Sequence, residues 1–359
     1  SILSITLEIK MTNVTSVTLA EATTLISTCG ANNTFIFQGE PGIGKSAMLT
    51  GLGHNHPSDY VYIDCALLDL GDLQMPVPAT DRKSVGFVPN DMFHVDSKTP
   101  ITIMLDEIGK ASRPVQNALL TLLHEHRVGS HKLPKGSTVF GTTNMSSDGV
   151  GDSMQAHAKN RVTYMKINKP THEEWIPWAA GNGVEPEILA WVNEYPHCLE
   201  SYSDTEGDDN PYIFNPKKQQ EAFVSPRSLF NASNLVKNRD KFSSSVLISA
   251  LSGTIGESAA KDMQAFITVA DSLPSWSQIM ANPAMAPVSN NPIANAILAM
   301  GAVMKVKRET APKWMEYNER LPKEVQFLFA SHVARSKNAA AMMTCLAFTN
   351  WCLANKWAV

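Results

Sequence analysis

The chain has 359 residues, of which 43% are hydrophobic and 18% charged, and its formal net charge is −4. This composition excludes an intrinsically disordered chain and suggests two or three domains with hydrophobic cores. The negative charge argues against duplex nucleic acid as the main ligand, because dedicated duplex binders usually carry a surplus of basic residues.

The cysteine pattern and the lengths of the apolar stretches bear on the cellular compartment. The five cysteines are scattered and form no C-x-x-C pair, which indicates free thiols rather than a disulfide framework or a zinc site. The longest apolar stretch, residues 293–304, is shorter than the roughly 20 residues that a membrane-spanning helix needs. The first residues, SILSITLEIKMTNV, lack the charged start and apolar core of a signal peptide. We therefore expect a cytoplasmic protein with no membrane segment.

After an N-terminal segment, residues 1–32, short β-rich runs alternate with helical patterns over residues 33–168. Apolar runs of this kind fit strands that are buried on both faces of a parallel sheet. The segment PVQNALLTLLHEHR has the apolar spacing of an amphipathic helix. The alternation predicts an α/β fold. The strand candidates are TFIFQG, YVYIDC, ITIMLDE, STVFGTTN and RVTYMKI.

The first strand candidate runs into a glycine-rich segment that fits the pattern G-x-x-x-x-G-K-[ST]. In this pattern, backbone N–H groups of the loop and of the following helix bind nucleotide phosphates. We expect Lys45 to reach the β- and γ-phosphates of ATP and Ser46 to bind Mg²⁺. The predicted nucleotide-binding residues of this segment are Gly39, Glu40, Pro41, Gly42, Ile43, Gly44, Lys45, Ser46 and Ala47.

Two adjacent carboxylates, Asp106 and Glu107, follow the apolar run ITIML. A buried strand that ends in a carboxylate pair has little structural reason to do so. Asp106 is predicted to bind the nucleotide-associated Mg²⁺ together with Ser46. Glu107 is predicted to act as the base that activates a water for attack on the γ-phosphate. A carboxylate beside the metal ligand favours water, rather than a second substrate, as the phosphoryl acceptor.

The strand candidate STVFGTTN ends at Asn144. A side-chain amide at this place is suited to orient the attacking water together with Glu107. The alternative is an ordinary turn residue, because asparagines often end strands at turns.

From residue 169 the strand patterns stop and helical patterns continue to about residue 272. The segment LPSWSQIMANPAMAPVSNNP, rich in Pro, Asn and Ser, then leads to a last helical stretch. We therefore predict an N-terminal segment over residues 1–32, a nucleotide-binding core over 33–168, a helical region over 169–272, and a linker with a C-terminal helical region over 273–359.

The order GEPGIGKS, IMLDE, a strand ending in asparagine, KNRV and SPRSL resembles the AAA+ ATPases, and more narrowly their MoxR-like branch. The run DEIGKASRPVQNALLTLLHEHRVGSHKLPKGSTVFGTTN is similar to the branch's segment from Walker B to sensor 1. The run DLGDLQMPVPATDRKSVGFVPNDMF resembles an insert in its second helix. The resemblance covers about residues 33–235. It implies a five-stranded parallel sheet with helices on both faces, a helical lid over 169–272, and assembly into a ring, usually a hexamer.

The resemblance also implies roles for two arginines. Arg161, in KNRV, matches the arginine finger that reaches the γ-phosphate held by a neighbouring subunit. Arg227, in SPRSL, matches sensor 2, and Ser225 and Pro226 are the expected N-cap and first residue of its helix.

Three further residues are assigned less directly. Arg113 and Arg127 are weaker candidates for the arginine finger than the arginine of KNRV. Phe87, in VGFVP, has two interpretations, a pore-lining residue or a core aromatic, and the core is the expectation because aromatic side chains are mostly buried.

Together these features predict a MoxR-like AAA+ ATPase that hydrolyses ATP with Mg²⁺ in a ring and remodels or activates a protein client. The resemblance implies a partner with a von Willebrand A domain. One alternative is a nucleic-acid motor, which the net charge of −4 disfavours. The other is a scaffold that binds ATP but scarcely hydrolyses it, which Glu107, Asn144 and Arg161 disfavour.

Overall fold

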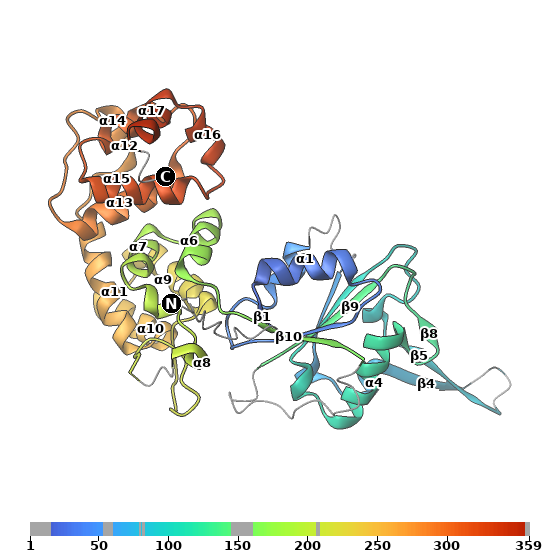
Figure 1. Cartoon of the computed structure of the whole chain (residues 1–359). Coiled ribbons are helices and arrows are strands. Elements are labelled where there is room, and N and C mark those ends of the chain that lie inside the picture. The colour runs from blue at the N-terminus through green and yellow to red at the C-terminus, as the bar shows by residue number, and fades with distance from the viewer. Residues whose placement is uncertain are drawn as a thin grey trace, which may run out of the picture. The chain divides into compact units, whose positions relative to one another are not determined.

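The computed structural model describes residues 16–52, 60–78, 80, 83–144, 161–205 and 209–355. Of the predicted N-terminal segment, residues 1–15 lie outside these ranges. The chain divides between Lys169 and Pro170 into two units, and both are drawn in Figure 1. The strands that the structure describes belong to the first unit, and the second unit is helical.

The first unit is built on a parallel sheet of six described strands in the order β1-β10-β2-β9-β6-β3. The five strand candidates of the sequence are all present. The edge strand β1 was not predicted, so the expected count of five is one too low, because its two residues are too few to show an alternation. The strands are β1 (Ser16–Val17), β2 (Phe35–Gln38), β3 (Tyr60–Asp64), β6 (Thr102–Asp106), β9 (Thr138–Thr143) and β10 (Thr163–Ile167).

Helices cover both faces of this sheet. Because successive side chains of a strand point to opposite faces, neighbouring residues of β2 pack against different helices. On β2, Phe37 belongs to a buried cluster that includes residues of α1 (Leu19–Cys29) and α2 (Ala47–Gly51). Its neighbour Ile36 belongs to a second cluster, with α4 (Arg113–Glu125). Figure 1 shows α1 and α4 on opposite sides of the sheet. The predicted class, a parallel α/β sheet with helices on both faces, is confirmed.

Two small antiparallel hairpins and several short helical segments extend the first unit. β4 and β5 form the first hairpin and β7 and β8 the second, while α3 precedes β4. Their bounds are α3 (Leu70–Leu73), β4 (Gln74–Pro78), β5 (Val85–Pro89), β7 (Arg127–Val128) and β8 (His131–Lys132). The 3₁₀ segments are Cys65–Leu67, Asp91–Phe93 and Ile108–Lys110.

The β4–β5 hairpin exposes apolar side chains on both of its faces. Met75 pairs with Val88 on one face, and Pro76 pairs with Phe87 on the other. The side chain of Phe87 is 50% exposed. The expectation that Phe87 is a core aromatic is therefore wrong, because a two-stranded hairpin has no second layer to bury it.

In the second unit, a single buried apolar cluster extends from Trp175 to Trp351. It includes residues on both sides of the predicted boundary at residue 273. No helix in the described part of the chain is both long and apolar enough to span a bilayer. The helices are α6 (His172–Gly181), α7 (Pro186–Glu194), α8 (Tyr202–Thr205), α9 (Pro226–Lys237), α10 (Ser244–Ile255), α11 (Glu257–Ala270), α12 (Trp276–Ala281), α13 (Pro292–Lys305), α14 (Ala311–Asn318), α15 (Lys323–Val333), α16 (Ala339–Met343) and α17 (Leu346–Ala354), with 3₁₀ segments at Pro196–Leu199 and Arg239–Lys241.

Candidate active site

The glycine-rich loop joins the end of β2 to the start of α2 along a path that requires glycine. Gly42 and Gly44 have positive φ angles, 76° and 101°, in a region that L side chains rarely adopt. At Gly39, an added Cβ atom would lie 2.6 Å from Cδ1 of Ile43. The glycine pattern of the loop is therefore dictated by backbone geometry and by packing.

The other loop residues differ in burial. Glu40 and Ile43 are buried, whereas Pro41 is partly exposed. Ser46 occupies the N-cap position of α2, and Ala47 is the first residue of that helix. The loop thus leads directly into a helix N-terminus, in which the N–H groups of Ala47, Met48 and Leu49 donate to the backbone oxygens three residues earlier.

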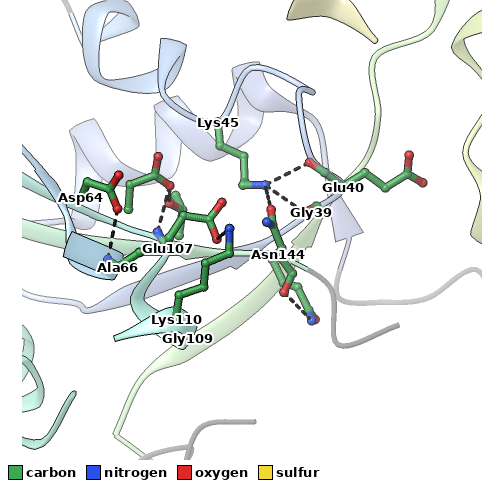
Figure 2. A network of polar contacts seen from close by, with 12 residues as sticks. Gly39, Glu40, Lys45, Asp64, Ala66, Glu107, Gly109, Lys110 and Asn144 are labelled. Atoms are coloured by element: carbon green, nitrogen blue, oxygen red, sulfur yellow. Dashed lines mark hydrogen bonds and ion pairs between the residues drawn. The ribbon is translucent and has the colours of Figure 1, made fainter. Parts of the chain in front are cut away.

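Lys45 is buried within the loop. The residue is only 6% exposed. Its Nζ donates to the backbone oxygens of Gly39 at 2.9 Å and Glu40 at 3.0 Å, and to Oδ1 of Asn144 at 2.8 Å. Figure 2 shows these three contacts converging on the ammonium group. They compensate the burial of its charge and link the loop to the end of β9.

Asp106 is the last residue of β6 and is 6% exposed. Its Oδ2 accepts a hydrogen bond from the hydroxyl of Tyr62 at 2.8 Å and lies 3.4 Å from Oγ of Ser46. Its Oδ1 accepts from the backbone N–H of Glu107 at 3.1 Å and from the hydroxyl of Thr142. The structure therefore brings together the two predicted metal ligands, Ser46 and Asp106.

Glu107 follows β6 with φ 54° and ψ 37°. A left-handed conformation is uncommon for a residue with a side chain, and here it turns the chain from the strand into the 3₁₀ segment Ile108–Lys110. Oε2 of Glu107 lies 3.2 Å from Nζ of Lys110, and both side chains are partly exposed. Figure 2 shows this ion pair. A partly exposed pair of this kind is worth at most about 1 kcal/mol, so it directs Glu107 without fixing it.

Asn144 lies directly after β9 and is 6% exposed. Its side-chain oxygen accepts the hydrogen bond from Lys45, and its backbone oxygen accepts one from Nε2 of Gln38 at 3.3 Å. The residue thus holds the ends of β2 and β9 and the loop lysine together. Its predicted role with a water molecule stays a prediction.

Arg161 is exposed and precedes β10. Thr163, the first residue of β10, pairs with Phe35, the first residue of β2. Because the strands are parallel, Arg161 lies at the amino end of the sheet, whereas the glycine-rich loop follows the carboxyl end. The four residues of β2 separate the two ends by about 13 Å at 3.3 Å per residue.

The amino end of the sheet also brings Arg161 close to the last turn of α4. Burial, and then the charge of Arg161, lower the pKa of His124. The pKa of Glu125 is lowered first by its hydrogen bond with Arg127 and also by Arg161. Nε of Arg127 lies 2.5 Å from Oε2 of Glu125. Of the arginines considered for the finger, Arg127 is thus engaged within its own unit.

Arg227 is exposed in the first turn of α9, in the second unit. The predicted start of its helix is confirmed. The side chain of Ser225 accepts a hydrogen bond from the backbone N–H of Ser228 at 3.1 Å, and Pro226 is the first helical residue. Its predicted role as sensor 2 stays a prediction.

Sequence reasoning did not predict a role for Tyr62 or Lys110 in the cluster. It also did not predict that Thr142 contacts Asp106. The signal for Tyr62 and Thr142 was strand alternation. Tyr62 pairs with Met104, which pairs in turn with Phe140, so both hydroxyl residues project to the same face as Asp106. The register that aligns three strands cannot be obtained from the pattern of each strand alone.

Two pKa values at the strand ends are raised by burial and by nearby carboxylates. Burial, then the charges of Asp106, Asp64 and Glu107, raise the pKa of the Cys65 thiol. Burial and the hydrogen bond with Asp106 raise the pKa of Tyr62. Burial is the largest cause of both shifts, and the nearby carboxylates add to it. Mg²⁺ takes oxygen ligands, so the hydroxyl of Ser46 and the carboxylate of Asp106 fit this ion chemically.

Comparisons with known proteins give only remote structural likenesses. No protein-family model and no curated protein matches the chain. Among solved structures, a candidate ATPase of Cytophaga hutchinsonii is similar at 15% identity and TM-score 0.32, covering 95% of this chain and 89% of that one. NtrX of Brucella abortus is similar at 12% identity and TM-score 0.32, covering 70% and 68%. A RuvB variant of Thermotoga maritima is similar at 13% identity and TM-score 0.37, covering 84% and 85%.

The chain has a parallel α/β sheet with helices on both faces, as its sequence patterns predict, and then a helical unit. Of the predicted site residues, Lys45, Ser46, Asp106, Glu107 and Asn144 meet at one end of the sheet.

Proposed function

We propose that the chain is a Mg²⁺-dependent ATPase of the AAA+ type, of the MoxR-like branch, which works in a ring and acts on a protein client. The observation that carries the proposal is the convergence at the carboxyl ends of the strands. There the buried ammonium of Lys45 contacts Asn144, and the carboxylate of Asp106 lies beside Ser46 and Glu107. A cation, a pair of metal-binding oxygens and a second carboxylate are the parts that phosphoryl transfer to water requires.

The residues divide the work of hydrolysis between binding and proton transfer. Lys45 and the loop N–H groups would bind the phosphates, and Ser46 and Asp106 would hold Mg²⁺, which would supply neutralisation of phosphate charge. Glu107 accepts a proton from water as the water oxygen bonds to the γ-phosphorus. The bond to the β–γ bridging oxygen breaks, and ADP and phosphate leave. The weak ion pair with Lys110 leaves Glu107 able to make this contact.

Asn144 is proposed to orient the attacking water. Its hydrogen bond with Lys45 supports this role, because Lys45 is the residue assigned to the β- and γ-phosphates and Asn144 therefore lies near their proposed position. Arg227 is proposed to sense the nucleotide from the helical region.

The proposed client is a protein, and the resemblance implies a partner with a von Willebrand A domain. The apolar side chains exposed on the β4–β5 hairpin support contact with protein, because exposed apolar patches often mark interaction sites. Purification of the assembled complex from its host, from wild type and from Phe87→Ser in parallel, tests this point. Clients retained equally by the variant would remove the hairpin from the role.

The proposed chemistry is tested by separating nucleotide binding from turnover. Lys45→Ala should weaken ATP binding, because the phosphates lose their cation. Glu107→Gln should retain binding and lose about 10²–10⁴-fold in turnover, because the metal ligands remain and only the base is removed. Binding is measured with a fluorescent ATP analogue and turnover by phosphate release.

Asp64→Asn is the matched control. Asp64 is the carboxylate at the end of the neighbouring strand β3, opposite Asp106, and accepts from the backbone N–H of Ala66 at 3.1 Å. We expect this variant to keep both binding and turnover. Near-normal turnover by Glu107→Gln, or an equal loss in Asp64→Asn, would contradict the assignment of Glu107.

A further inference from the structure

The carboxylate of Asp106 is held from both sides by hydroxyl groups of the neighbouring strands. Tyr62 on β3 donates to Oδ2 at 2.8 Å, and Thr142 on β9 donates to Oδ1. The two strands flank β6 in the sheet. Each oxygen of the carboxylate therefore has a hydroxyl partner on a different strand.

Strand register makes this arrangement possible. Tyr62 pairs with Met104, two residues before Asp106, and Phe140 pairs with Met104 from the other side. In paired parallel strands, residues in register project to the same face, and so do residues two apart. Tyr62 and Thr142 consequently converge on Asp106 from the same face of the sheet.

The donors in this set are neutral. The hydrogen bonds that the structure gives to Asp106 come from three hydroxyls and one backbone N–H. A buried carboxylate needs such partners, and a salt bridge would meet the same need. A neutral donor, however, orients the carboxylate without cancelling its charge, so the charge stays available to a bound cation.

Core packing does not account for Tyr62. Val61 and Ile63, its neighbours on β3, are buried, whereas Tyr62 is 48% exposed. Its hydroxyl nevertheless contacts Oδ2, the oxygen that lies beside Ser46. Tyr62 thus fixes the carboxylate oxygen that faces the second predicted metal ligand.

We propose that Tyr62 and Thr142 are positioning residues that hold the carboxylate of Asp106 in the orientation in which it binds Mg²⁺ together with Ser46. The proposal rests on the proposed ATPase function. Residues that orient a metal ligand typically contribute 10–100-fold to metal affinity.

The test measures the Mg²⁺ dependence of nucleotide binding in a Glu107→Gln background, in which turnover does not interfere. A fluorescent ATP analogue is titrated at a series of Mg²⁺ concentrations and in EDTA. Tyr62→Phe should raise the Mg²⁺ concentration for half-maximal effect about 10-fold, with affinity in EDTA unchanged. Thr142→Val should act in the same direction, whereas Thr142→Ser, which keeps the hydroxyl, should behave like the parent. Tyr164→Phe, in a partly exposed tyrosine of β10, is the control and should change nothing.

Two results would overturn the positioning role while leaving the ATPase proposal intact. One is an unchanged Mg²⁺ dependence in Tyr62→Phe when the parent binds nucleotide with Mg²⁺. The other is an equal loss of affinity with and without Mg²⁺, which indicates general damage to the site. Failure of the parent itself to bind the nucleotide would instead contradict the proposed function.

Discussion

The two ends of the parallel sheet differ in how complete their chemistry is. At the carboxyl end, buried polar side chains bind one another, as in the contacts of Lys45 with Asn144 and of Asp106 with four donors. At the amino end, Arg161 is exposed beside the last turn of α4. The proposed phosphate-binding residues and the proposed arginine finger thus lie at opposite ends of one sheet.

This difference bears on the proposal that a neighbouring subunit completes the site. The separation of about 13 Å along β2 keeps Arg161 away from the loop of its own chain, whereas an exposed arginine is accessible to a neighbour. The hypothesis that Arg161 acts on ATP held by the next subunit is therefore supported by strand polarity as well as by the KNRV motif.

The largest expected effect comes from breaking the amino end. Arg161→Ala should lose about 10³–10⁵-fold in turnover and still bind ATP, because an arginine finger stabilises charge in the transition state. Mixed with Glu107→Gln in one ring, it should recover activity, because an interface then exists with Glu107 from one subunit and Arg161 from the other. Turnover is measured across mixing ratios, with subunit exchange between rings confirmed.

The mixing experiment distinguishes action between subunits from action within one. An arginine that acts on its own chain would leave every subunit with one broken site. A flat line at zero activity across all ratios would thus contradict the assignment, and Arg113→Ala serves as the control that should remain active without mixing.

A smaller effect is expected from backbone changes at the carboxyl end. Gly39→Ala should destabilise the protein by about 1 kcal/mol, the low end of the range for overpacking, because its Cβ would lie 2.6 Å from the end of the buried Ile43 side chain and 3.3 Å from the backbone oxygen of Ile167. Gly51→Ala, at the end of α2, should stabilise by about 0.4–1 kcal/mol, because the nearest atom to its Cβ would be 3.6 Å away. Urea unfolding measures the free energy of unfolding of both variants. Equal values for the two would contradict the close packing around Gly39.

The smallest effect is expected in the β4–β5 hairpin, which belongs to neither end of the sheet and supplies a baseline. Phe87→Ser should change the free energy of unfolding by no more than about 0.5 kcal/mol, because the side chain is 50% exposed. Its basal ATP turnover should equal that of wild type. A loss of more than 2 kcal/mol in the same urea assay would mean that Phe87 is buried in solution, by this chain or by another copy.

Local sequence patterns were sufficient to predict the main strands, the glycine-rich loop and the carboxylate pair. Continuous apolar runs identify buried strands, and the loop is defined by glycines whose backbone angles admit little else. The start of α9 was predictable for the same reason, since Ser225 and Pro226 act within a single turn.

What was missed depends on contacts between segments distant in sequence. Phe87 was expected in the core because aromatic side chains are mostly buried, but its burial depends on a second layer that the hairpin lacks. The convergence of Tyr62 and Thr142 on Asp106 depends on the register of three strands. The two-residue strand β1 exists because β10 offers it an edge.

The proposed binding of a nucleotide phosphate to Lys45 involves an exchange of hydrogen-bond acceptors. An ammonium group has three N–H donors, and the acceptors of Lys45 include the backbone oxygens of Gly39 and Glu40 and Oδ1 of Asn144. An incoming phosphate oxygen would compete with these neutral acceptors for the ammonium group. What changes is the charge of the acceptor, from a neutral carbonyl or amide to an anion, and charge-assisted hydrogen bonds are about twice as strong as neutral ones. Lys45 is therefore expected to favour a phosphate oxygen over its neutral acceptors because the phosphate carries a charge.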